Sequence, residues 1–306
     1  MADRHNKGLH RYAVCTAAAT LFLLLAGALV TSNDAGLAVP DWPLSYGSLM
    51  PPMVGGIFYE HGHRLVATLV GMLTIGLAVW LWRREERRWL RRLGWAALGA
   101  VILQGVLGGL TVIFLLPTVV SVSHASLAQL FFCATVAIAL FTSRWWQSAV
   151  KPVDDNGAPA MHRLALAMAA TVFIQLVLGA AFRHQGIGIL PHILWAVVVL
   201  GMTVYLSRVI RKRFPGVAAL RRASVILSAL VGVQILLGLG AWWTRILATE
   251  LPQPPVFMVA ATVVHVVVGA LTLATSVVLA LCVYRVVRPA AATAPVLAGE
   301  LQERTP

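Results

Sequence analysis

The stretch Glu60-His61-Gly62-His63-Arg64 opens an apolar run that extends to Trp82. In a helix, Glu60 stands three residues before His63 and four before Arg64, so these three side chains can share one face. Ionisable groups at the end of a membrane-spanning run are costly, and they mark a functional site by default. This stretch therefore predicts a membrane helix with a candidate site at its mouth.

The apolar content of the chain decides its fold class. Hydrophobic residues make up 59% of the 306 residues and charged residues only 11%, more apolar surface than a soluble protein can bury. A helix needs about 20 apolar residues to cross the hydrocarbon of a bilayer. We expect an all-α integral membrane protein with eight spans, near residues 12–31, 62–82, 94–116, 122–142, 162–182, 190–209, 223–243 and 258–284. The first run is interpreted as a retained helix rather than a signal peptide, because seven more spans follow it.

The net charge of +13 reflects topology rather than nucleic-acid binding. Arginine and lysine crowd the links between spans two and three and between spans six and seven, whereas the opposite side holds only Arg64, Arg183 and Arg245. By the positive-inside rule, both termini are expected in the cytoplasm. The three cysteines (Cys15, Cys133 and Cys282) fall within predicted spans, so no disulfide or metal-thiolate pair is expected.

The spans repeat as helical pairs. The pattern Gln-x-x-Leu-Gly occurs at 104–108, 175–179 and 234–238, each time in an odd-numbered span. A histidine opens each even-numbered span; these are His63, His124, His192 and His265. The repeat predicts two tandem, pseudo-symmetric four-helix bundles of the same orientation. The expected divisions are 1–150 with an outer loop at 31–59, a cytoplasmic linker at 151–157, a second bundle at 158–290 and a cytoplasmic tail at 291–306. Interhelical hydrogen bonding is the alternative interpretation of the glutamines.

The four histidines lie at equivalent repeat positions and at a similar depth near the outer face. Imidazoles without a carboxylate cluster or a thiolate suit haem iron, and helical bundles build haem sites from facing helices. We expect one bis-imidazole site in each half, His63 with His124 and His192 with His265. Packing histidines and a zinc site are the alternatives, although four histidines split between two halves make a poor tetrahedron. With no such pair in the inner leaflet, a transmembrane electron wire is not expected.

The halves differ in one carboxylate. Glu60 precedes His63, whereas Ile189-Leu190-Pro191 precedes His192. A site with a carboxylate suits chemistry on a bound porphyrin, and a ligand-only site suits a fixed prosthetic haem. A simple ion pair with Arg64 is the alternative role of Glu60.

Four further polar residues lie near the outer face. Arg64 and Arg183 are candidate partners for haem propionates. His61 points away from Glu60 on the helix and is expected to be solvated or to line the mouth. His184, which follows the fifth span, has no assigned role.

The sequence resembles the haem A synthase family from roughly residue 12 to 285. The resemblance rests on eight spans in two halves, on Gly36-Leu37-x-x-x-Asp41-Trp42-Pro43, on Glu60-x-x-His63-Arg64 and on the later histidines. It implies a haem-dependent oxidoreductase that hydroxylates the C8 methyl of haem O and oxidises it to a formyl group, giving haem A for terminal oxidase assembly. It implies that His63 and His124 bind the substrate haem, that His192 and His265 bind haem b as cofactor, and that Glu60 is the catalytic carboxylate.

The resemblance also implies a setting and partners. The protein is expected in the inner membrane of a bacterial-type cell, with the haem sites near the outer face. Haem O synthase is a candidate partner, a quinone is one candidate electron acceptor, and a homo-oligomer is a candidate assembly. Many bacterial members carry a cysteine pair in the first outer loop, but this loop has none and Ser45 stands where a cysteine is expected. A thiol-based relay is therefore not expected.

Two other functions compete with this interpretation. A non-enzymatic b-type cytochrome, serving as a haem carrier or electron-transfer subunit, would use the same four histidines. A transporter built on the parallel repeat would need broken helices with polar residues at the midplane, which is nearly bare here.

Overall fold

The computed structural model describes residues 6–249, 251 and 253–289, and the expected tail at 291–306 lies outside them. In the described residues, eight helices are long and apolar enough to span a membrane. They are α1 (Lys7–Ser32), α2 (Gly55–Arg84), α3 (Arg88–Ile113), α4 (Thr118–Thr142), α6 (Met161–Arg183), α7 (Leu190–Arg213), α8 (Ala218–Leu247) and α9 (Val256–Val286). The predicted all-α membrane fold is confirmed.

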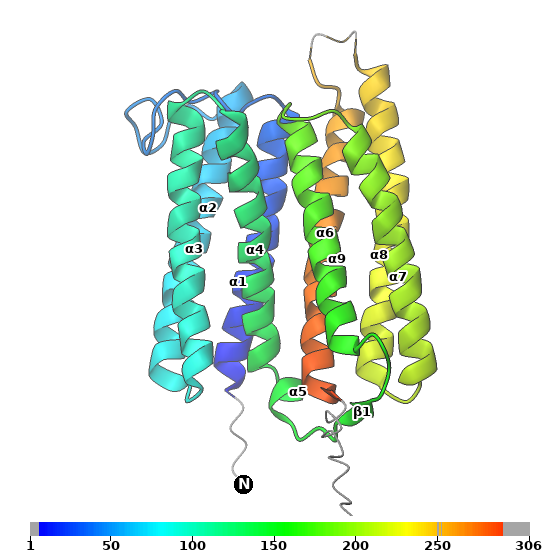
Figure 1. Ribbon diagram of the computed structural model, residues 1–306. Coiled ribbons are helices and arrows are strands. Elements are labelled where there is room, and N and C mark those ends of the chain that lie inside the picture. The colour runs from blue at the N-terminus through cyan, green and yellow to red at the C-terminus, as the bar shows by residue number, and fades with distance from the viewer. Residues whose placement is uncertain (1–5, 250, 252, 290–306) are drawn as a thin grey trace, which may run out of the picture.

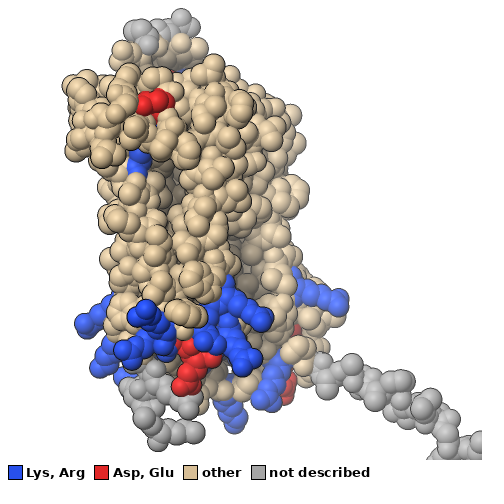
Figure 2. Space-filling view, turned by 90° about the vertical axis from the view of Figure 1, so that its left-hand side faces the viewer, with Lys and Arg blue, Asp and Glu red and all other residues tan. Residues whose placement is uncertain are grey.

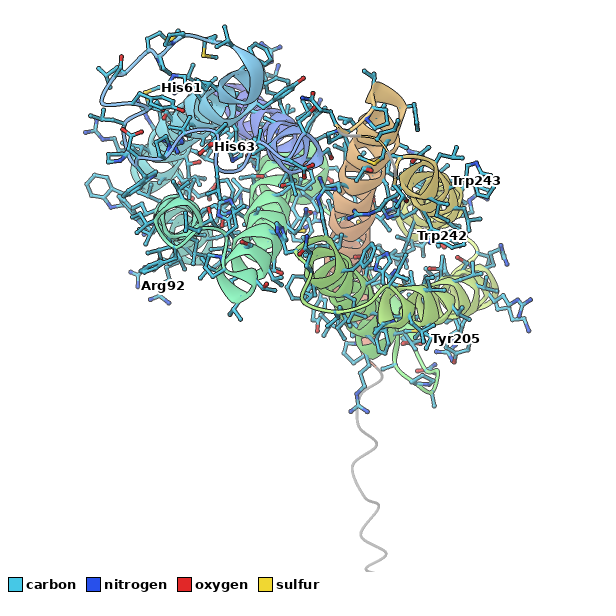
Figure 3. All side chains as sticks on the ribbon, turned by 90° about the horizontal axis from the view of Figure 1, so that it is seen from above. His61, His63, Arg92, Tyr205, Trp242 and Trp243 are labelled. Carbon is cyan, nitrogen blue, oxygen red and sulfur yellow. The ribbon has the colours of Figure 1, made fainter. Side chains whose placement is uncertain are left out.

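The helices pack side by side in two groups of four (Figures 1 and 3). In the first group, α1 and α3 each pack against both α2 and α4. In the second group, α6 and α8 each pack against both α7 and α9. Contacts of α1 and α4 with α9, and of α4 with α6, join the groups along one seam. This packing brings each histidine-bearing helix (α2, α4, α7 and α9) beside the spanning helix that precedes it in the chain (α1, α3, α6 and α8).

Apolar side chains fill the interior of each group. Leu77, Leu81 and Ile138 are almost fully buried in the first, and Met168 and Leu206 in the second. Many outward-facing side chains of the same chemistry remain exposed, as lipid contact requires.

Short elements close the basic end of the molecule. Helix α5 (Arg144–Gln147) follows α4, and strand β1 (Val153–Asp155) pairs in parallel with β2 (Val287–Pro289) directly after α9. Asp155 Oδ2 accepts a 2.6 Å hydrogen bond from the backbone N–H of Met161 at the start of α6. The segment expected as a linker is therefore held in place by backbone pairing and by a helix-capping bond.

Lysine and arginine gather at the end of the molecule where α1 begins and α2 ends (Figure 2). The residues there include Arg83, Arg84, Arg88, Arg91, Arg92, Arg211, Lys212 and Arg213. The four candidate histidines lie in the first three turns of α2, α4, α7 and α9, and these helices begin at the opposite end. The assignment of the basic end to the cytoplasm stays a prediction.

Candidate functional site

The segment between α1 and α2 folds into a compact loop over the start of α2 (Figure 1). The Asp41 carboxylate accepts hydrogen bonds from the backbone N–H groups of Tyr46 (2.6 Å) and Gly47 (2.8 Å), both of which have positive φ. These bonds, from Gly47 and then Tyr46, lower the pKa of Asp41 below its ordinary value. The Trp42 ring lies against Gly109 of α3, where a Cβ would come within 2.7 Å of it. The loop is thus tied both to itself and to α3.

Glu60 is buried, with only 4% of its surface exposed. Its Oε1 accepts a hydrogen bond from Arg64 Nη2 at 2.7 Å, and its Oε2 accepts one from the backbone N–H of Val39 at 2.8 Å. Arg64 Nη1 donates to the backbone carbonyls of Asp41 (2.8 Å) and Leu44 (2.6 Å). The Glu60–Arg64 ion pair considered from the sequence is therefore present, and the outer loop completes it. A buried charge is tolerated when it is paired and hydrogen-bonded in this way.

The solvated alternative for His61 was wrong, and its role in lining the mouth stays a prediction. Its side chain is not solvated but only 5% exposed, and its Nδ1 lies 2.8 Å from the hydroxyl oxygen of Ser45, which is also buried. The outer loop folds back over the first turns of α2, so His61 is covered by the loop and not by water (Figure 3). The position on the helix was judged correctly, but the path of the loop cannot be read from the periodicity of α2.

Each of the four candidate ligands has its ring against a glycine of the preceding spanning helix. All four histidines are half-buried. A Cβ placed on these glycines would press on the imidazole Cε1 more tightly than ordinary contact allows. The pairs and their Cβ–Cε1 distances are Gly27 with His63 (3.1 Å), Gly108 with His124 (3.2 Å), Gly179 with His192 (2.9 Å) and Gly238 with His265 (3.1 Å). Three of these glycines are the last residue of the Gln-x-x-Leu-Gly pattern. The sequence therefore shows their positions but not their contact with the histidine rings.

The glutamines of the pattern bond to the histidine-bearing helices. Their Nε2 atoms donate to the backbone carbonyl of the facing histidine. The distances are 2.8 Å for Gln104 to His124, 3.0 Å for Gln175 to His192 and 2.9 Å for Gln234 to His265. The alternative role considered for these residues, interhelical hydrogen bonding, is therefore what they perform here.

The second histidine pair fits a bound haem iron. His192 Nδ1 lies 3.2 Å from the backbone carbonyl oxygen of Gln175, which can only accept, so Nδ1 carries the proton and Nε2 is the acceptor. Metal-binding histidines are commonly oriented in this way. The side-chain Nε2 of Gln175 lies 3.3 Å from this ring Nε2, and a metal bound there would replace that contact. The His192 and His265 ring centroids are 6.3 Å apart, which leaves room for a metal ion bonded at about 2 Å to each ring.

The first pair shares some of these features. Nδ1 of His63 and Nδ1 of His124 are buried, and neither has a hydrogen-bond partner among the described residues. Within residues 6–249, 251 and 253–289, no group of three or more histidine, cysteine or acidic side chains could hold a metal ion on its own. The donor set therefore favours pairs of imidazoles around haem over a tetrahedral zinc site.

Arg183 lies between the two groups of helices. Its Nη2 donates to the backbone carbonyl of Ala28 (3.0 Å) and to the hydroxyl of Ser32 (2.7 Å), so it links α6 to α1. The next residue, His184, accepts a hydrogen bond at its backbone carbonyl from Thr118 of α4. Burial, and then the charge of Arg183, lower the pKa of His184, which keeps its ring neutral near pH 7. Contact of Arg64 or Arg183 with a propionate stays a prediction.

Comparison with known proteins gives matches over part of the chain. Residues 55–192 match the family model described as "Cytochrome oxidase assembly protein". The protein named "Heme A synthase" from Symbiobacterium thermophilum is 30% identical over 185 residues, which is 59% of this chain and 60% of that protein. The protein of the same name from Shouchella clausii is 36% identical over 137 residues, 44% of this chain and 45% of that protein. The chain thus matches about half to three-fifths of the length of these relatives.

Proposed function

The chain belongs to the haem A synthase family, and on that premise we propose that it oxidises the C8 methyl of haem O to a formyl group. The product, haem A, would serve the assembly of terminal oxidases. One observation carries the proposal: four repeat-related imidazoles each lie against a glycine, and a buried carboxylate lies within one turn of only one of them.

In this proposal, one histidine pair binds the substrate and the other binds the cofactor. His63 and His124 hold the substrate porphyrin in the half at 1–150, and His192 and His265 hold haem b in the half at 158–290. When bound, haem b supplies one-electron redox chemistry. The chain itself contributes neutral imidazole lone pairs, a close fit of each ring against a glycine, and a loop that covers the start of α2.

Glu60 is the residue that we assign to the chemistry. It precedes His63 by three residues on α2, so its carboxylate lies within one helical turn of the imidazole that would hold the substrate porphyrin. Arg64 and the Val39 N–H hold the carboxylate in place. There it positions a water or stabilises the positive charge that develops at the methyl carbon. The carbon takes its oxygen from water and releases four protons and four electrons (R–CH3 + H2O → R–CHO + 4 H⁺ + 4 e⁻), and a membrane quinone is our candidate acceptor.

The setting follows from topology. The chain is a multi-pass bacterial membrane protein. We place both termini in the cytoplasm and the histidine pairs near the outer face, because the basic residues gather at the end away from the histidines. Haem O synthase remains our candidate partner for substrate delivery.

Pigment extraction after co-expression with a source of haem O tests the activity. Haem A in the extract is the expected result. Unconverted haem O together with haem b would refute the proposal and favour a b-type cytochrome.

Substitution of Glu60 tests its role. A Glu60→Gln protein should still bind both haems but form little haem A, because the neutral amide cannot stabilise developing positive charge. A Glu60→Gln protein that binds both haems and forms haem A at the normal rate would refute the role of the carboxylate.

A further inference from the structure

The first helical pair departs from the other three at one position. Four residues before the glycine that contacts each histidine ring, three pairs have a glutamine and the first has Leu23. The Leu23 side chain is half-buried and packs against the apolar cluster of the first group of helices. A leucine has no hydrogen-bond donor, so nothing at this position can bond the backbone carbonyl of His63 as the glutamines do in the other pairs.

The glutamine bonds make the second pair of histidines better anchored than the first. Gln175 and Gln234 both donate to the backbone carbonyl of the facing histidine, a bond that leaves the ring Nε2 available to iron. In the first pair, only His124 has such a bond, from Gln104. The ring of His63 contacts Gly27, but its helix is not tied to α1 at this level by a glutamine.

The first helical pair resembles the others in having a small residue at the position over which the glutamine amide lies. At Gly269, four residues after His265, a Cβ would come within 3.1 Å of Gln234 Nε2, so the amide lies over this small residue. The residues at the equivalent positions are also small: Ala67, Ala128 and Ala196. The distinguishing residue is therefore Leu23 itself.

We propose that Leu23 makes His63 the exchangeable ligand of the first pair, so that porphyrin enters and leaves on the His63 side. Gln104 keeps His124 in position, and Gln175 with Gln234 retain the second porphyrin. A histidine whose own backbone carbonyl is bonded to the facing helix loses less freedom when it binds iron, so it holds iron longer. The turn of His63 is held by the loop bonds of Glu60 and Arg64 but has no glutamine bond from α1. The inference rests on the proposed function, which requires one porphyrin to be exchanged and the other retained.

The test is the rate at which the full-length protein, loaded with iron protoporphyrin at both sites, loses haem to an excess of a haem-scavenging globin. Absorbance should resolve a fast phase from the first pair and a slow phase from the second. Leu23→Gln should slow the fast phase about 3- to 30-fold, the range for an interhelical hydrogen bond in a membrane, and should leave the slow phase unchanged. Leu23→Met, which has nearly the length of glutamine but no donor, should change neither phase.

If Leu23→Gln does not fold, the opposite change at the second site, Gln234→Met, tests the same inference. Gln234→Met should accelerate the slow phase by a similar factor and leave the fast phase unchanged. Equal rates for Leu23→Gln and Leu23→Met, an unchanged slow phase in Gln234→Met, or a protein that binds no haem would each overturn the inference. Haem loss is measured without any oxidation of the porphyrin. A protein that exchanges haem as expected but makes no haem A would refute the proposed function alone.

Discussion

Gly238→Ala should weaken haem binding at the second site, because the added methyl presses on a ligand ring that cannot easily move. The new Cβ would lie 3.1 Å from His265 Cε1, so the ring must shift by a few tenths of an ångström. Gln234 Nε2 donates to the His265 backbone carbonyl at 2.9 Å, which holds that turn of α9 and opposes the shift. Overpacking of this kind costs about 1–3 kcal/mol, which corresponds to about a 5- to 150-fold loss of affinity.

Gly240→Ala is the matched control on the same helix. A Cβ at Gly240 meets nothing within 4 Å, and alanine is the better helix former by about 1 kcal/mol. This variant should keep full haem affinity and equal or greater thermal stability. The assay is titration of the haem-depleted protein with iron protoporphyrin, followed by absorbance. If Gly238→Ala binds as tightly as Gly240→Ala, then the glycine contact does not position the ligand and our reasoning about all four glycines fails.

Two further predictions concern the outer loop and the start of α2. Arg64→Met should destabilise the protein by about 3–5 kcal/mol, because it leaves the Glu60 carboxylate buried without its partner. Adding Glu60→Gln should recover much of that loss in thermal unfolding, and purely additive effects of the two changes would contradict the pairing. Because the pKa of Asp41 is lowered in the folded loop, its contribution should be complete above the ordinary value of 3.8 and be lost as the pH falls through the lowered value. Protease digestion of the loop should therefore increase over that acidic range, and Asp41→Asn should be cleaved readily at every pH; a variant with the wild-type pH profile would refute this.

Hydropathy located all eight helices but misjudged several ends. The second span was expected to begin at 62, yet α2 begins at Gly55, because Glu60 and His61 are paired with the loop and need not end the helix. The third span was expected to continue to 116, whereas α3 ends at Ile113 and Leu115 and Leu116 adopt positive φ. No glycine marks that turn, and Pro117 indicates that a helix ends nearby but not at which residue it ends.

The candidate site was predictable as far as it depends on the repeat. Spacing alone identified the four histidines and the glutamines, because each unit restates the same positions. Glu60 bonds to Val39, 21 positions earlier, and His61 to Ser45, 16 positions earlier. Both partners lie in an irregular loop, and periodicity carries no information about its path. The glycine contacts were also missed, because a small residue in a membrane helix is usually explained by close helix packing.

The central claim is that paired imidazoles of the two halves hold two haems. The most direct test is the ratio of haem to protein, measured together with the low-spin absorbance of bis-imidazole iron, in the wild type and in a His265→Ala variant. We predict two low-spin haems per chain in the wild type and one in the variant, the remaining haem bound by His63 and His124. A wild-type protein without haem, or a His265→Ala protein that keeps both haems low-spin, would contradict the account.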